Sequence, residues 1–207
     1  HPKDLQDGKI EITSNDVLAN VPFVEGCGLW FDHHSSETQR LQLAGKFKGA
    51  CEMAPSAARV IYNYYAKEPH DAAKLKKFTE MLVDVDKADS ASYTKQDILD
   101  PQRWMLLAFL SDPRTGMGYT HTYRISNFEL MKSLPGMLRT MTIDQILANP
   151  DVQERIKTYR ADNEKYKKVL QETAHIDGDA IVLDLRGKKE MPSGNRFMEY
   201  TLFPDQN

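Results

Sequence analysis

GLWFDHHSSE, residues 28–37, is the stretch from which the fold of this chain can be inferred. It continues the apolar run CGLWF of residues 27–31, which is short, follows a glycine and is typical of a parallel strand buried on both faces. The serines and the glutamate at its end offer an N-cap and an acidic first turn for a helix that we expect to reach about residue 45. Three ligand-type side chains therefore follow directly after a buried strand, at the sheet edge where open α/β proteins place their sites.

These three side chains are Asp32, His33 and His34. Imidazole and carboxylate groups are ligands that divalent ions such as Mn²⁺ and Zn²⁺ accept in proteins. Because neighbouring side chains of an extended chain point in opposite directions, we expect one histidine to bind a metal ion and the other to reach a substrate oxygen. The alternative is a pair of ordinary loop histidines beside an acid, and composition alone leaves the two interpretations balanced.

Outward from this stretch, the chain alternates between short strands and amphipathic helices. Alternating or continuous apolar residues predict strands at residues 9–13 and 180–185, with a turn or short helix at 14–18 and a looser segment at 46–54. Helical spacing and N-cap residues predict helices over residues 55–67, 71–85, 102–110, 127–139 (kinked or split by Pro135), after Thr142, and 150–175, with a loop at 114–124. The composition shifts near residue 177, and we expect a domain boundary at residues 175–178.

The composition is that of an ordinary globular domain. Hydrophobic residues make up 41% of the 207 residues, and the net charge of −3 comes from 27 basic and 30 acidic residues. This balance argues against a strongly basic nucleic-acid binder and against a polybasic membrane anchor. No run of 18 apolar residues occurs, and two thiols, Cys27 and Cys51, suit a reducing compartment, so we expect a cytoplasmic protein with no membrane contact. The chain begins at His1 without a methionine and stops at Asn207 soon after a new βα-like pattern has begun, so we expect it to be cut from something longer.

Four segments together resemble the DHH phosphoesterase superfamily. They are GLWFDHHSSE at residues 28–37, APSAARVIYNYY at 54–65, VDKADSA at 85–91 and SGNRFMEYTLFP at 193–204. The second and third resemble the exopolyphosphatase-related or RecJ-like branch, and the last resembles the start of the DHH-associated domain. The resemblance covers nearly the whole chain.

The resemblance implies an α/β fold with a parallel sheet flanked by helices. Residues 1–176 would form the DHH domain, with a helical section at about 96–175, and residues 177–207 would form a linker strand and the start of a second α/β domain. The implied activity is divalent-metal-dependent hydrolysis of a phosphoester or phosphoanhydride. The implied substrates are polyphosphate, short oligonucleotides or cyclic dinucleotides, and a homodimer is compatible with the family.

The resemblance also assigns roles to residues. His33 matches a metal-binding histidine, His34 the residue that contacts the scissile phosphate, and Asp32 a catalytic carboxylate that fixes the rings from behind. A later metal-binding aspartate falls in the third segment, where Asp89 is preferred to Asp86. The expected cofactor is a pair of Mn²⁺ ions, with Mg²⁺ or Co²⁺ as alternatives, and paired ions would activate water for in-line attack on phosphorus.

Substrate contacts are expected from the last segment. Arg196 lies beside Asn195 at a predicted helix start, and both a guanidinium and a helix N-terminus favour anions. Ser56 and Arg59 lie on the helix of the second segment, where we expect them to support the core.

The sequence departs from the family pattern at the early acidic motif. Nothing in residues 1–19 matches the expected Asp-x-Asp, because Asp4, Asp7 and Asp16 stand in the wrong context. Asn20 falls where the family often has another metal-binding aspartate, and an amide is a weaker ligand. We therefore expect this chain alone to be inactive, and the alternative function is a degenerate DHH-fold protein that binds metal or nucleotide as a scaffold.

Overall fold

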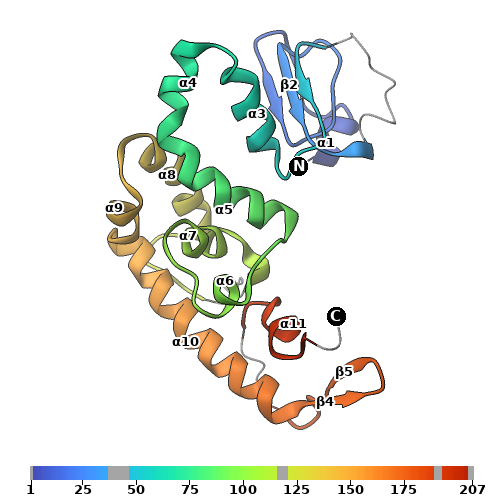
Figure 1. The fold of residues 1–207 in the computed structure, drawn as a ribbon, viewed down its shortest axis with the longest axis vertical. Helices are drawn as coiled ribbons and strands as arrows, with labels where there is room; N and C mark the ends of the chain where they lie inside the picture. The colour runs from blue at the N-terminus through green and yellow to red at the C-terminus, as the bar shows by residue number, and fades with distance from the viewer. Residues whose placement is uncertain (1, 37–46, 116–120, 189–192, 205–207) are drawn as a thin grey trace. The chain divides into compact units, whose positions relative to one another are not determined.

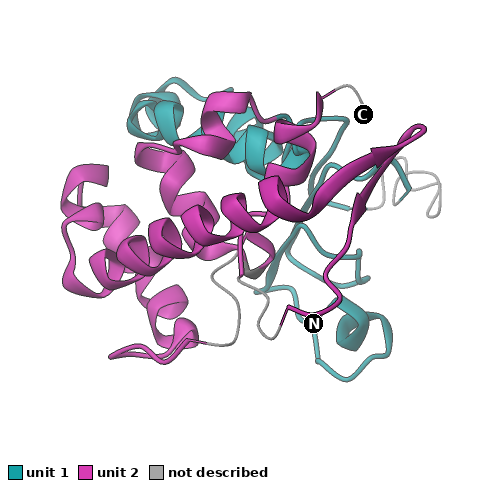
Figure 2. Cartoon of the chain, turned by 90° about the horizontal axis from the view of Figure 1, so that it is seen from below, with its two compact units in different colours: residues 1–92 teal, residues 93–207 magenta. Residues whose placement is uncertain are grey.

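The computed structural model describes residues 2–36, 47–115, 121–188 and 193–204. The chain divides into two compact units, residues 1–92 and 93–207 (Figures 1 and 2). Most of the helix expected to end near residue 45 lies outside the described residues.

A three-stranded parallel sheet forms the centre of unit 1. Its strands are β1 (Val17–Ala19), β2 (Leu29–Asp32) and β3 (Gly49–Cys51), in the order β1-β2-β3. In the register, Trp30 of β2 pairs with Leu18 and Gly49, and both ladders are parallel. The expected α/β class with a parallel sheet and flanking helices is confirmed, and β2 is the central strand (Figure 1).

The central strand is apolar because both of its faces are covered. Trp30 packs against Phe23 and Phe47, with ring centroids 5.3 and 4.9 Å away, while Phe31 packs edge-to-face on Tyr64 of α3, 5.1 Å away. Trp30 and Phe31 are 0% and 1% exposed. Two consecutive residues buried on opposite faces explain why the sequence shows a continuous apolar run here instead of an alternating one.

Close approach of two strands requires a glycine at the start of β3. Gly49 has a φ of +119°, and a Cβ built there would lie 2.0 Å from the carbonyl oxygen of Trp30. Any larger residue would push β3 away from β2, so this glycine fixes the sheet spacing beside the site.

Five helical segments accompany the sheet in the described residues of unit 1. They are α1 (Pro2–Gln6), α3 (Ala57–Tyr65), α4 (Pro69–Leu75), the 3₁₀ turn η1 (Lys76–Phe78) and α5 (Thr79–Ser90). Helix α3 contacts β2, β3 and α5. It begins at Ala57, two residues after the expected start, with Ser56 as N-cap accepting a hydrogen bond from the Arg59 amide.

Four expectations for unit 1 are wrong in detail. Residues 9–13 are irregular because the Asp16 carboxylate accepts hydrogen bonds from the amide and hydroxyl of Thr13 and closes a turn there. Strand β1 lies instead in the segment expected to be a turn, and β3 lies in the segment expected to be loose. The helix predicted over 71–85 is divided by η1, and α5 runs on through the acidic residues to Ser90.

Unit 2 is mainly helical. Its elements are α6 (Lys95–Leu99), α7 (Arg103–Ser111), the 3₁₀ turn η2 (Pro113–Thr115), α8 (Asn127–Thr140), α9 (Ile143–Leu147), α10 (Pro150–Thr173), β4 (Ala174–Asp177), β5 (Ala180–Leu183) and α11 (Met198–Leu202). The predicted helices are recovered as α7 to α10, and α6 was not expected. Helix α8 continues through Pro135 without being split.

Two apolar clusters hold unit 2 together. The larger joins α7, α8, α9 and α10 around side chains such as Phe109, Ile146 and Val152. The smaller joins α6, α10 and α11 and includes Tyr166 and Met198. The C-terminal segment that resembles a second domain therefore packs on α10.

An antiparallel hairpin follows the long helix. Strands β4 and β5 pair with Ala174 opposite Leu183, so the boundary expected at residues 175–178 falls inside this hairpin. The compact units instead divide between Ser92 and Tyr93. Among the helices described, none combines the length and the apolar character needed to cross a lipid bilayer.

Candidate active site

Asp32, His33 and His34 lie at the carboxyl end of the central strand of unit 1. Asp32 is the last residue of β2, and one ligand atom of each of the three side chains lies within 4.8 Å of the others. The neighbouring parallel strands end beside them, β1 before Asn20 and β3 before Glu52. The sequence-based expectation about where the triplet lies in the sheet thus agrees with the structure.

The Asp32 carboxylate is a buried acceptor that organises this turn. It is 1% exposed, and its Oδ1 accepts hydrogen bonds from the His33 amide at 2.6 Å, the His34 amide at 3.0 Å and His34 Nδ1 at 2.6 Å. A carboxylate that accepts from the ring places the proton on Nδ1 of His34. The Nε2 atom of His34 is then left for a ligand, on a side chain that is 53% exposed.

His33 is oriented by a different partner. Its Nδ1 donates to the carbonyl oxygen of Ala54 at 2.9 Å, because a carbonyl oxygen can only accept. In the neutral ring, Nε2 then carries a lone pair. The ring fixed by Asp32 is therefore that of His34, while His33 is fixed by the chain segment that follows β3.

The lone-pair nitrogen of His33 faces a carboxylate. Its Nε2 lies 3.2 Å from Asp89 Oδ2, yet it is buried and makes no hydrogen bond to any described residue. Two acceptors this close repel each other unless a second proton on the ring or a cation lies between them. Two ligand atoms about 2.1 Å from one ion and at right angles to each other lie about 3 Å apart, so this pair matches the spacing of two metal ligands.

The position of Asp89 on its helix also suits a cation. Asp89 is in the last turn of α5, which ends at Ser90, and the C-terminal end of a helix carries partial negative charge. Imidazole nitrogen with carboxylate oxygen is a ligand set that Mn²⁺ and Zn²⁺ accept. His33 and Asp89 therefore fit a divalent ion.

Asp86, the other candidate, is occupied by protein partners. Its Oδ1 accepts from Ser56 Oγ at 2.7 Å, and its Oδ2 accepts from Nε and Nη2 of Arg59 at 2.8 and 2.5 Å. The geometry therefore favours Asp89 over Asp86 as the metal-facing residue. Ser56 and Arg59, expected only to support the core, hold this carboxylate between α3 and α5.

Asn20 stands at the carboxyl end of β1 in an uncommon conformation. Its φ is +56°, a value that asparagine tolerates better than most residues, and its amide donates to the Phe31 carbonyl at 3.0 Å. It is exposed at the same sheet edge as the triplet.

The two residues expected to bind substrate lie in unit 2. Asn195 is 0% exposed; its amide donates to Asn163 Oδ1 at 2.7 Å and its Oδ1 accepts from the Phe197 amide at 3.0 Å. Asn195 is therefore used inside the protein. Arg196 is exposed, with its guanidinium 4.8 Å from the ring centroid of Phe197.

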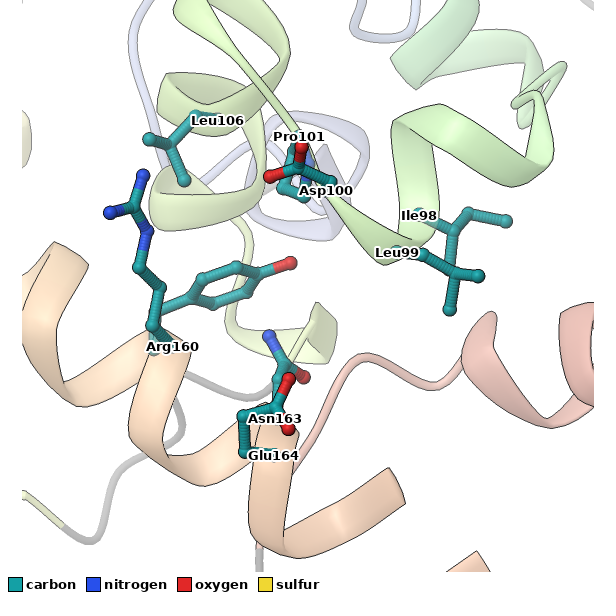
Figure 3. A pocket seen from close by; sticks show the side chains of 9 residues that line it. Ile98, Leu99, Asp100, Pro101, Leu106, Arg160, Asn163 and Glu164 are labelled. Carbon is teal, nitrogen blue, oxygen red and sulfur yellow. The ribbon is translucent and has the colours of Figure 1, made fainter. Parts of the chain in front are cut away.

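A separate cavity of about 400 Å³ lies within unit 2 (Figure 3). Its walls combine apolar side chains with groups of both charge signs. They are contributed by α6, the segment between α6 and α7, α7 and α10: Ile98, Leu99, Asp100, Pro101, Leu106, Tyr159, Arg160, Asn163 and Glu164. None of the residues expected to be catalytic or metal-binding lines it.

Sequence reasoning missed the residues that connect the site to its surroundings. The Ala54 carbonyl cannot be recognised from sequence, because its role depends only on where β3 brings the backbone. The link from Asp86 to Ser56 and Arg59 joins positions 30 and 27 residues apart. Ser56 did carry a signal, as an N-cap before an apolar periodic run, but that signal predicts a helix start and not a link to α5.

A solved phosphodiesterase structure shares the fold of almost the whole chain. The TM-score is 0.82 at 38% sequence identity, and the match covers 99% of this chain and 65% of that one. The fold is therefore similar to that of a DHH-like phosphodiesterase, and nothing in the match points to the exopolyphosphatase-related or RecJ-like branch. That solved structure, to which this chain is similar, is the pGpG-specific phosphodiesterase PggH from Vibrio cholerae.

This chain spans about two thirds of the length of that phosphodiesterase, 65%. No protein-family model matches the chain, and no curated protein matches it either.

Proposed function

We propose that this chain carries the metal-binding and phosphate-contacting part of a divalent-metal-dependent phosphodiesterase that hydrolyses short linear oligonucleotides, with pGpG as the first substrate to test. The support for the substrate class is the likeness to a pGpG-specific phosphodiesterase at 38% identity. This substrate replaces polyphosphate as the first choice, because the likeness gives no support to an exopolyphosphatase. A cytoplasmic location and a homodimer remain predictions.

One observation carries the metal part of the proposal. His33 Nε2 is buried, lacks a hydrogen bond and lies 3.2 Å from Asp89 Oδ2. A buried polar atom without a partner is costly, and a shared cation removes that cost for both groups. We take Mn²⁺ as the probe because it accepts both donor types.

The remaining residues of the cluster have separate roles in this proposal. His34 presents Nε2 to a phosphate oxygen, while the buried Asp32 holds the ring in one orientation through Nδ1. A divalent ion, when bound, would supply Lewis-acid polarisation of the phosphoryl group. Precise placement of His34 matters because a misdirected donor loses most of its effect on a transition state.

A second candidate function is metal or nucleotide binding without turnover. It is favoured by Asn20, an uncharged amide at the sheet edge where the family resemblance expects an aspartate. This candidate predicts Mn²⁺ binding at His33 without hydrolysis of any phosphodiester.

The first experiment is calorimetric titration of this chain with Mn²⁺. We expect saturable binding that His33→Ala and Asp89→Asn abolish or weaken at least about tenfold, since each removes a ligand. His70→Ala, which changes an exposed histidine of the same unit, is the matched control and should bind like the wild type. Equal binding by all four proteins would refute the site.

Hydrolysis is then measured with the complete reading frame. We expect Mn²⁺-dependent release of mononucleotide from pGpG. This release should be faster than the release of phosphate from polyphosphate. If the wild type binds Mn²⁺, His33→Ala does not, and neither substrate is hydrolysed, the enzyme is rejected and the scaffold function is supported.

A further inference from the structure

We propose that Arg59 and Asp86, together with Ser56, are positioning residues that hold Asp89 at a fixed distance from His33. The inference rests on the proposed metal site and concerns residues that do not touch the metal. It gives a role in metal affinity to an ion pair that could otherwise be taken as ordinary support between two helices.

The network is strong because each group in it is hydrogen-bonded and shielded from water. Arg59 directs two nitrogens at one carboxylate oxygen of Asp86, and Ser56 donates to the other oxygen. The side chains of Arg59 and Asp86 are 27% and 14% exposed, and Ser56 is 1% exposed. Charge-assisted bonds that leave water excluded are stronger and more directional than surface ion pairs.

One end of the network is tied to His33. Ser56 begins α3, and its hydroxyl accepts from the Arg59 amide at 3.0 Å while donating to Asp86. Two residues earlier, the Ala54 carbonyl accepts from His33 Nδ1. The short segment 54–56 therefore connects the histidine ring to the first turn of α3.

The other end is tied to Asp89. Asp86 and Asp89 are three residues apart on α5, so their side chains lie on the same face of the helix. Fixing Asp86 against Arg59 fixes the rotation and the distance of α5 relative to α3. Asp89 is thereby held 3.2 Å from His33 Nε2, although Arg59 and Ser56 bind Asp86 and not Asp89 itself.

The inference differs from simple structural support in what it predicts for the metal. If the network only stabilised the fold, its loss would lower the unfolding midpoint and leave the Mn²⁺ affinity of the folded protein unchanged. A positioning role requires that Mn²⁺ affinity falls in protein that remains folded, because the His33–Asp89 spacing is no longer fixed. Partners that orient metal ligands typically contribute about 10–100-fold in affinity.

The test compares Arg59→Lys and Asp86→Asn with the wild type. Lysine keeps the positive charge but cannot direct two nitrogens at one carboxylate, and asparagine keeps the size but loses the charge. Mn²⁺ affinity is measured by calorimetry, and the coordination of bound Mn²⁺ by electron paramagnetic resonance, at a temperature where circular dichroism shows every variant fully folded. The matched control is Arg114→Lys, the same substitution in the Arg114–Asp112 ion pair of unit 2.

We expect about 10–100-fold weaker Mn²⁺ binding and an altered spectrum for both variants, with wild-type values for Arg114→Lys. Wild-type affinity in folded Arg59→Lys and Asp86→Asn, alongside lost binding in Asp89→Asn, would overturn the positioning role and leave the proposed function intact. Absence of Mn²⁺ binding by the wild type would overturn both. A third outcome is that both variants bind Mn²⁺ more weakly and the complete reading frame does not hydrolyse pGpG. This outcome would support the positioning role and reject the enzyme.

Discussion

One carboxylate oxygen of Asp32 accepts three hydrogen bonds, and these bonds explain the role of Asp32 in the triplet. The carboxylate fixes the two backbone amides after β2 and the ring of His34, while His33 relies on the Ala54 carbonyl. The two neighbouring histidines are thus oriented by different groups and present different atoms. We infer that changes at one histidine can be separated from changes at the other.

His34→Gln tests this separation. Glutamine removes the ring that Asp32 orients but leaves His33 and Asp89 in place, so we expect Mn²⁺ affinity within about threefold of the wild type. The rate constant for pGpG hydrolysis should fall about 10²-fold, which is typical for loss of one positioned donor. Calorimetry and initial-rate assays check the two values, and loss of Mn²⁺ binding in His34→Gln would contradict the division of roles.

Elements with strong local signals were predictable, and elements defined by their partners were not. The apolar run of β2 and the helix start at Thr142 were recognised because their signals lie within a few residues, whereas Ser56 was not singled out as an N-cap. Strands β1 and β3 have three residues each, too few for a periodic pattern, and they are strands because β2 lies between them.

The candidate site shows the same limit. Adjacency in sequence makes the triplet visible, and the resemblance directed attention to the acids of α5. Spacing could not choose between Asp86 and Asp89, because residues three apart share a helix face. The choice depends on Arg59 and Ser56, which reach Asp86 only through the packing of α3 on α5.

At the level of the sheet, Gly49→Ala should be among the most destabilising small changes in unit 1. Its Cβ would lie 2.0 Å from the Trp30 carbonyl, so overpacking of about 1–3 kcal/mol adds to about 1–2 kcal/mol for a positive φ. Gly26→Ala is the control, since Gly26 also has a positive φ but open space around it. Urea unfolding should show the larger loss for Gly49→Ala, and equal losses would show that the contact with Trp30 is easily relieved.

On the scale of the whole molecule, the candidate metal site and the tyrosines with raised pKa values lie in different units. The candidate metal site lies entirely in unit 1, whereas the tyrosines whose pKa values are raised lie in unit 2. For Tyr166, burial raises the pKa above its usual value of about 10, and the hydrogen bond to Glu199 raises it further. Alkaline pH should therefore weaken unit 2 through residues that have no part in the site.

The expected pH dependence follows from the sign of this shift. Above about pH 10 the unfolded chain loses the Tyr166 proton while the folded chain keeps it, so stability is full below that pH and falls as the pH rises further. Tyr166→Phe lacks this proton, and the difference in unfolding free energy between wild type and variant should shrink from pH 8 to pH 11. Urea unfolding of both proteins at several pH values measures this difference in unfolding free energy. A difference that stays constant with pH would contradict the raised pKa of Tyr166.

The placement of every candidate metal-site residue before Ser92 also has a consequence for biosynthesis. Synthesis proceeds from the N-terminus at about 5–20 residues per second, and domains generally fold as units in that order. The segment that holds His33, Ser56 and Asp89 leaves the ribosome while the long helix α10 is still being made. We infer that the candidate metal site can form during translation, several seconds before synthesis of residues 93–207 is finished.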